Sequence, residues 1–209
     1  MIKLVILDID GVLTDGTIQI DAQGHEHKTI HIKDIDAIFA LKNQGFRLAA
    51  VTGEQTEIVG YFENRFPWDW FFQGKKNKLE TVRVLLKEQG LTMEEVAYIG
   101  DGKYDVPLLS EAGLSFCPAD AIEEAKQQAD FVLRNPGGMG CVWEMASILE
   151  TYTAQKREET YVYQRIREHQ SVFHSMASDV SGIREIMAAG KNMVNRLKQG
   201  AQIFLCGNG

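Results

Sequence analysis

The sequence predicts an α/β fold, a doubly wound and mostly parallel sheet with helices on both faces. Short apolar runs alternate with helical patterns as far as about residue 150. Several of these runs are continuous rather than alternating, which is typical of strands that are buried on both faces. The apolar content, 44% of 209 residues, is enough for one sizeable core. Because strands and helices alternate along the chain, the sheet is expected to be parallel.

Six short apolar runs are the predicted strands. They are KLVILDID (3–10), RLAAVTG (47–53), WFFQG (70–74), VAYIGDG (96–102), LSFCPA (114–119) and DFVL (130–133). One segment, GTIQIDAQGHEHKTIHIKD (16–34), breaks the rhythm: it alternates around DAQG and therefore predicts a β-hairpin. His25, His27 and His31 fall at nearly alternate positions of this hairpin, which favours a polar strand face over a zinc site.

Four segments between the strands have apolar residues three and four positions apart, the spacing of amphipathic helices, and two of them end in glycine. They are DIDAIFALKNQG (34–45), EQTEIVGYFENRF (54–66), NKLETVRVLLKEQG (77–90) and AIEEAKQQA (121–129).

The character of the chain changes after Ile148, so we divide it into a domain over 1–150 and an extension over 151–209. The extension contains no proline, and its pattern predicts two helices with a break near Ser178–Gly182. The last segment, AQIFLCGNG, reads as a strand that runs into a glycine-rich turn.

Charge and composition exclude several classes of partner. The net charge is −7 and no run rich in Lys or Arg is present, which disfavours nucleic acid and anionic membranes. No apolar stretch approaches the ~18 residues of a membrane-spanning helix. The cysteines, Cys117, Cys141 and Cys206, are odd in number and widely spaced, which indicates reduced thiols and a cytoplasmic protein.

Two aspartates stand at the tip of the first predicted strand. Asp8 and Asp10 point to the same side, because side chains alternate along a strand. Two carboxylates that close repel each other unless a divalent cation or a shared proton intervenes. Other strands also end in polar or acidic residues, in VTGE, QGKKNK and GDGKYD. Since ligands of open α/β sheets bind beyond the carboxyl ends of the strands, these segments predict one site.

The motifs DIDGVLTDG, VTGE, Lys78 and GDGKYD resemble, in order and spacing, those of the haloacid dehalogenase-like phosphohydrolases. The first is similar to the motif of phosphatases that act on 2-keto-3-deoxy sugar acid phosphates, enzymes of lipopolysaccharide biosynthesis. The resemblance spans about residues 1–150 and implies a phosphoric monoester hydrolase.

The resemblance also implies the roles of individual residues. Asp8 matches the nucleophile that takes up the phosphoryl group, and Asp10 matches the general acid and base. Thr52 is expected to bind a phosphoryl oxygen, and Lys78 to offset the negative charge of the transferred group. The implied cofactor is Mg²⁺, held by Asp8, Asp101 and the carbonyl of Asp10.

Several assignments stay open at the level of the sequence. Lys75 or Lys76 could take the place of Lys78, and Asp105 could ligate the metal through water, hold Lys78 or begin a helix. Many relatives carry a second aspartate where this chain has Gly102.

Candidate substrate-binding residues are Gly11, Gly53 and Glu54. Relatives that act on eight-carbon acids typically have TGR at this motif, and relatives that act on nine-carbon acids have TGE, as here. A glutamate there could also simply favour the start of a helix.

The spacing between Asp10 and Thr52 leaves no room for a cap domain. In capless members the resemblance implies a homotetramer in which a neighbour's hairpin or tail covers the site. NPGGMGCVWEM (135–145) resembles the glycine-rich tail of these phosphatases, with Met139 where some carry an arginine. The end of the chain resembles the entry to a sugar-isomerase domain, which leaves a phosphatase–isomerase fusion as an alternative.

Two other readings compete with a phosphatase. A phosphoacceptor signalling domain uses an aspartate, a threonine, a lysine and Mg²⁺ on a similar sheet, but it does not place a base like Asp10 beside its phosphate. A phosphomutase also uses the DxD pattern but normally needs a cap to reorient its intermediate.

Overall fold

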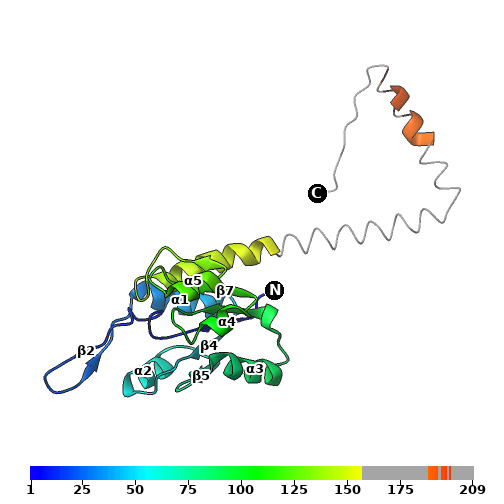
Figure 1. Cartoon of the computed structure of the whole chain (residues 1–209). Coiled ribbons are helices and arrows are strands. Elements are labelled where there is room, and N and C mark those ends of the chain that lie inside the picture. Colours follow the sequence, from blue (N-terminus) through cyan, green and yellow to red (C-terminus); the bar gives the residue numbers. More distant parts are fainter. Residues whose placement is uncertain (157–187, 193, 197, 199–209) are drawn as a thin grey trace. The chain divides into compact units, whose positions relative to one another are not determined.

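The computed structural model describes residues 1–156, 188–192, 194–196 and 198 of the chain (Figure 1). The chain separates into two compact units, Met1–Gln155 and Lys156–Gly209. The first unit carries the sheet, and the described residues after 187 are helical. No helix among the described residues is long and apolar enough to cross a membrane.

The first unit is built on a six-stranded sheet in the order β5-β4-β1-β6-β7-β8. All of its neighbouring strands pair in parallel. The strands are β1 (Leu4–Leu7), β4 (Arg47–Val51), β5 (Trp70–Phe72), β6 (Val96–Ile99), β7 (Leu114–Cys117) and β8 (Phe131–Val132). Every strand lies within one of the predicted runs, and the predicted fold class is confirmed.

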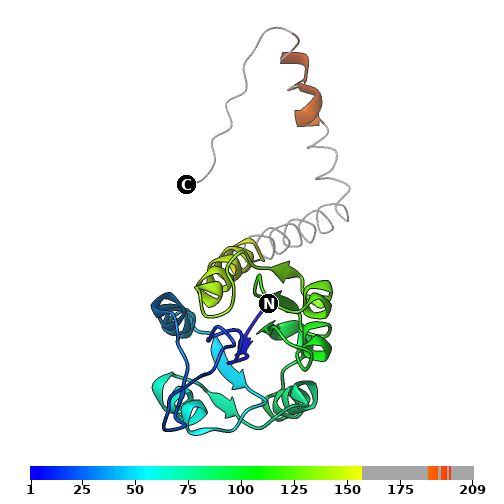
Figure 2. The same cartoon turned by 60° about the vertical axis from the view of Figure 1, so that its left-hand side comes forward.

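Helices cover both faces of this sheet (Figure 2). The helical elements are α1 (Ile32–Asn43), α2 (Glu57–Arg65), α3 (Lys78–Gln89), the 3₁₀ turn η1 (Met93–Glu95), α4 (Val106–Leu109), α5 (Glu123–Gln128) and a helix over residues 141–156. The short helix α4 is absent from the sequence prediction, because four residues are too few for a periodic pattern.

Two apolar clusters, one on each face, form the core. Residues from α1, α2 and the helix over 141–156 pack in the first cluster, and residues from α3, α4 and α5 in the second. Along β1 the clusters alternate: Val5 and Leu7 belong to the first, and Leu4 and Ile6 to the second. This alternation is the period of two that a strand imposes on its side chains.

The predicted hairpin is present as a separate two-stranded sheet. The strands β2 (Gln19–Ile20) and β3 (Glu26–His27) pair antiparallel, and the hairpin extends away from the large sheet (Figure 1). At its turn the ring of His25 lies 2.9 Å from Asp21 and that of His27 lies 3.5 Å from it. Both rings are exposed, as a polar strand face requires.

A glycine-rich loop before the helix over 141–156 packs against the loop that follows β1. A Cβ atom at Gly137 would lie 2.0 Å from the carbonyl oxygen of Gly11, so only glycine fits there. Asp34, fully buried near the start of α1, accepts hydrogen bonds from the backbone N–H groups of Gly140, Val142 and Trp143 at 2.9, 2.9 and 3.1 Å. Asp34 thus holds this loop and the start of the helix in place.

The predicted division at residue 150 falls inside the helix over 141–156, and the first compact unit ends at Gln155. The described residues 151–156 and 188–192 are helical, as expected for the extension. The predicted break near Ser178–Gly182 and the final strand and glycine turn lie outside the described residues.

Candidate active site

The polar residues singled out at the strand ends meet in one cavity. Its volume is about 430 Å³, and it opens beyond the carboxyl ends of β1, β4 and β6. The lining residues are Asp8, Asp10, Thr52, Gly53, Glu54, Lys76, Lys78, Asp101, Gly102, Tyr104 and Asp105. This is the edge at which ligands of parallel α/β sheets bind.

Lys78 is the cation at the centre of the cavity. It is the first residue of α3, whose N-cap is Asn77, and its side chain is only 4% exposed. Its Nζ atom lies 2.7 Å from Asp8 Oδ2 and 2.5 Å from Asp105 Oδ1. Burial lowers the pKa of Lys78, but the two carboxylates outweigh burial and the net pKa is raised. Lys78 is therefore a fixed positive charge next to Asp8.

Asp105 organises the loop that follows β6. Its Oδ1 also accepts a hydrogen bond from the Tyr98 hydroxyl at 2.5 Å, and its Oδ2 accepts the backbone N–H groups of Asp101 and Gly102 at 3.1 and 2.8 Å. Burial first, and then the charge of Asp105, raise the pKa of Tyr98, so this phenol stays a donor. Of the roles left open for Asp105, the contacts favour holding Lys78. Asp105 is also the N-cap residue of α4, although its side chain makes no capping hydrogen bond there.

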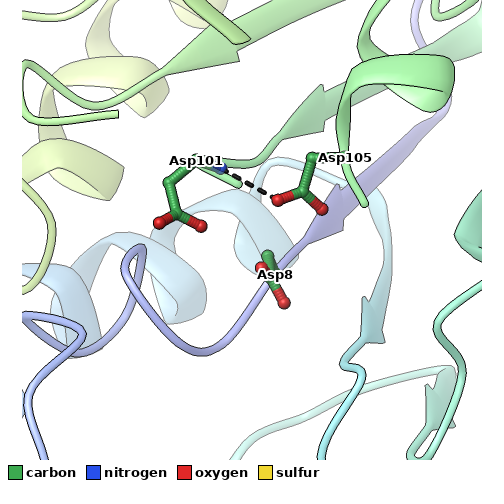
Figure 3. Close-up of side chains that lie close together, drawn as sticks. All are labelled: Asp8, Asp101 and Asp105. Atoms are coloured by element: carbon green, nitrogen blue, oxygen red, sulfur yellow. Dashed lines mark hydrogen bonds between the residues drawn. The ribbon is translucent and has the colours of Figure 1, made fainter. Parts of the chain in front are cut away.

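Three carboxylates gather around one point (Figure 3). Asp8, Asp101 and Asp105 each offer an oxygen within 4.8 Å of the other two. Burial is the main factor that raises the pKa of Asp8, against the pull of Lys78, and burial followed by Asp105 raises the pKa of Asp101 to about 6. Oxygen donors with an excess of negative charge suit Mg²⁺ or a similar hard cation, which would favour the ionised carboxylates.

Gly11, which follows Asp10 directly, lies close against one of the three clustered carboxylates. Gly11 has φ +78°, and a Cβ atom there would lie 2.1 Å from Asp101 Oδ2. A side chain at position 11 would therefore collide with a carboxylate of the cluster. Gly11 shapes the site by its lack of a side chain, while Gly53 lines the cavity.

Thr52 lies directly after β4 and is almost completely buried. Its hydroxyl oxygen accepts the backbone N–H of Glu54 at 3.1 Å, which leaves the hydroxyl hydrogen free to donate. That arrangement suits a donor to an anionic oxygen in the cavity.

A second lysine, Lys28, contacts the rim of the cavity from the hairpin. Its Nζ atom lies 2.5 Å from Asp10 Oδ1 and 2.8 Å from Glu54 Oε2. Burial lowers the pKa of Lys28, but its hydrogen bonds to Asp10 and Glu54 outweigh burial and the net pKa is raised. Asp10 and Glu54 are more open, with 26% and 40% of their side chains exposed.

The structure brings together every site residue that the sequence singled out. Their roles stay predictions. Sequence reasoning did not single out Lys28 or Tyr104. Lys28 comes from the hairpin, and Tyr104 lies within the GDGKYD motif at a position to which the sequence assigned no role. Sequence reasoning weighed Lys76 only as a substitute for Lys78. Lys76 instead lies over the Tyr104 ring, 6.0 Å from its centre, while Lys78 contacts Asp8.

A parallel sheet with an aspartate at the tip of β1, and with a lysine and further carboxylates at neighbouring strand ends, defines a class of hydrolases. The chain belongs to the haloacid dehalogenase-like hydrolases, whose family pattern matches residues 61–145.

Relatives of known name indicate which hydrolases of this family the chain is similar to. The chain is 37% identical over 148 residues to the 3-deoxy-D-manno-octulosonate 8-phosphate phosphatase KdsC of Haemophilus influenzae, across 71% of this chain and 82% of that protein. The cobalt-bound structure of the Haemophilus influenzae phosphatase matches with a TM-score of 0.66 and 37% identity, over 70% of this chain and 86% of that one.

A Moraxella catarrhalis phosphatase of the same name, in complex with magnesium, phosphate and KDO, matches with a TM-score of 0.69 and 29% identity. The match covers 78% of this chain and 92% of that one.

Proposed function

We propose that the protein, a phosphoric monoester hydrolase, removes phosphate from a 2-keto-3-deoxy sugar acid phosphate of eight or nine carbons through a phosphoaspartate on Asp8. The observation that carries this proposal is the placement of Asp8 against Lys78 in a cavity that also holds Asp10. The names of the relatives support the substrate class.

The residues divide the reaction between them. Asp8 attacks phosphorus, and the leaving sugar oxygen takes a proton from Asp10 as the P–O bond breaks. Asp10 then removes a proton from water, which attacks the phosphoaspartate and releases phosphate and the free Asp8 carboxylate. Lys78 and the Thr52 hydroxyl stabilise the charge on the phosphoryl oxygens.

Asp8 and Asp101 would hold the divalent metal, with the backbone carbonyl of Asp10. Their carboxylates belong to the only such cluster among the described residues, and the third member, Asp105, is occupied by Lys78 and Tyr98. When bound, Mg²⁺ would neutralise the charge between the nucleophile and the substrate. Chelation with EDTA is expected to abolish turnover, and added Mg²⁺ to restore it.

The length of the substrate is open to a direct test. Phosphate release is measured on a panel that contains 3-deoxy-D-manno-octulosonate 8-phosphate and 2-keto-3-deoxynononate 9-phosphate. The proposal expects one of them to give the highest kcat/KM of the panel. A higher value for a simple aldose phosphate would contradict the substrate class, and a phosphorylated protein that accumulates would favour a signalling domain instead.

We also propose that the hairpin mediates assembly into a homotetramer, which the open cavity requires for shielding from water. Ile18 and Ile20 are 44% and 69% exposed on it, and its edges carry unpaired backbone groups. Light scattering on the full chain tests this proposal. Ile20→Glu is expected to dissociate the assembly and lower activity, whereas a fully active wild-type monomer would contradict it.

A further inference from the structure

The hairpin contributes one buried charge to an otherwise exposed segment. Residues 22–27 are all exposed, whereas the Lys28 side chain that follows them is 1% exposed. A lysine is almost never buried unless it is paired, and here both partners are carboxylates of the cavity. Lys28 therefore joins the hairpin to the acid–base side of the site rather than to the core.

The contact with Lys28 makes the two oxygens of Asp10 different. Oδ1 lies 2.5 Å from Lys28 Nζ. Oδ2 is buried and has no hydrogen-bond partner among the residues that the structure describes. A buried carboxylate oxygen without a partner costs free energy, and such atoms in native proteins call for an explanation.

Glu54 holds Lys28 from the other side. With Glu54 Oε2 at 2.8 Å, the ammonium group lies between two carboxylates and cannot rotate away from Asp10 without losing one of them. Glu54 lies two residues after Thr52, just beyond the end of β4, so the strand end and the hairpin together set the position of Lys28. The carboxylate of Asp10 is thereby restrained through its Oδ1 atom.

We propose that Lys28 is a positioning residue for the acid–base step: it occupies Oδ1 of Asp10 and leaves Oδ2 to exchange the proton with the leaving oxygen and with water. This inference rests on the proposed phosphatase function and deepens it. It also gives the hairpin a task within its own subunit, separate from any contact with a neighbour.

The test compares substrates with different leaving groups. A nitrophenolate needs no proton, whereas an alkoxide does, so loss of Asp10 positioning must affect alkyl phosphates more. Lys28→Met is expected to lower kcat for an alkyl phosphate about tenfold or more and for p-nitrophenyl phosphate only about twofold, with KM nearly unchanged. Lys28→Arg, which keeps the charge, should recover part of the loss. The matched control is Lys87→Met on the exposed side of α3.

Three results would overturn the inference. Equal losses on both kinds of ester would make Lys28 a general stabiliser of the site. A raised KM at constant kcat would make it a ligand of the substrate's anionic groups. A Lys28→Met protein that lacks a cooperative thermal transition would make the lysine a requirement for folding.

A failure of the proposed function can be distinguished from these three results, because three esters are compared. The esters are 3-deoxy-D-manno-octulosonate 8-phosphate, glycerol 2-phosphate and p-nitrophenyl phosphate. If the wild type hydrolyses only the last two, the substrate class is wrong, and the ratio of losses on glycerol 2-phosphate and p-nitrophenyl phosphate still decides the role of Lys28. If the wild type hydrolyses none, the phosphatase proposal itself fails, and the inference about Lys28 fails with it.

Discussion

Lys78 and Lys28 each bridge two carboxylates of the cavity, but they come from different parts of the molecule. Lys78 begins α3, and the carboxylates that it contacts follow β1 and lie in the loop after β6, within the frame of the sheet. Lys28 comes from the hairpin, outside the large sheet, and its partners at the rim are partly exposed. The group proposed to attack phosphorus is thus held by the core, and the group proposed to move protons is held by an added segment.

Because of this difference, the Lys78 centre (Lys78, Asp8 and Asp105) and the Lys28 centre (Lys28, Asp10 and Glu54) should respond differently to mutation. Changes around Lys78 should affect both chemistry and stability, because buried charges lose their compensation. Changes around Lys28 should affect proton transfer more than stability, because Asp10 and Glu54 are partly exposed and water can solvate them when the lysine is lost.

The largest effect on activity is expected for Asp8→Asn, which removes the proposed nucleophile. Turnover should be abolished, while the melting temperature holds or rises, because the change relieves repulsion among three carboxylates and leaves Lys78 paired with Asp105. Phosphate release and thermal unfolding measure the two quantities. Activity above a few per cent of wild type would remove Asp8 as the nucleophile.

The second-largest effect is expected for Lys78→Met. It removes the charge that offsets Asp8 and Asp105, so kcat should fall about 10²–10³-fold. The free energy of unfolding, from urea titration, should drop by about 3–5 kcal/mol, as when one partner of a buried ion pair is lost. Lys87→Met on the same helix serves as the control. A stable, active Lys78→Met protein would show that the core does not depend on this pair.

Asp10→Asn should have a smaller effect that depends on the substrate. Phosphoryl transfer from p-nitrophenyl phosphate should survive better than transfer from a sugar phosphate, since nitrophenolate leaves without a proton. Burst kinetics separate this step from slow hydrolysis of the proposed phosphoaspartate. If both esters lose the same factor in the burst, Asp10 does not act as the acid.

The smallest expected effect is the dependence of stability on pH that comes from Asp101. The pKa of Asp101 is about 6 in the metal-free protein, above its ordinary value of 3.8, so the folded state binds a proton that the unfolded chain releases. The stability that this proton contributes is full below pH 3.8 and is lost as the pH rises through about 6.

Urea unfolding in EDTA at about pH 5 and about pH 8 measures this loss. Asp101→Asn should show a smaller drop between the two than the wild type does, and an equal drop would exclude Asp101 as its source.

The two centres also differ in how far the sequence predicts them. The strand tips and the start of α3 follow from periodicity and from the family resemblance, so Asp8, Asp10, Thr52, Lys78 and Asp101 could be named in advance. Lys28 could not, because nothing in an alternating hairpin shows where its side chains reach. The contact of Asp105 with Lys78 was one of three possibilities, but its bonds to Tyr98 and to the backbone of Asp101 and Gly102 could not be predicted, since they depend on how a short loop folds back on β6.

The bonds from Asp34 to the glycine-rich loop have a consequence for synthesis of the chain. Asp34 and Gly140 are 106 positions apart, so the ribosome synthesises Asp34 long before the glycine-rich loop that donates to it. A nascent chain that ends before Gly140 lacks all three backbone N–H groups that donate to the Asp34 carboxylate. Contacts of such long range form late, because closing the chain between them costs entropy first. The loop after β1, against which Gly137 of the same glycine-rich segment packs, is therefore expected to reach its final packing only after nearly all of the first unit has been made.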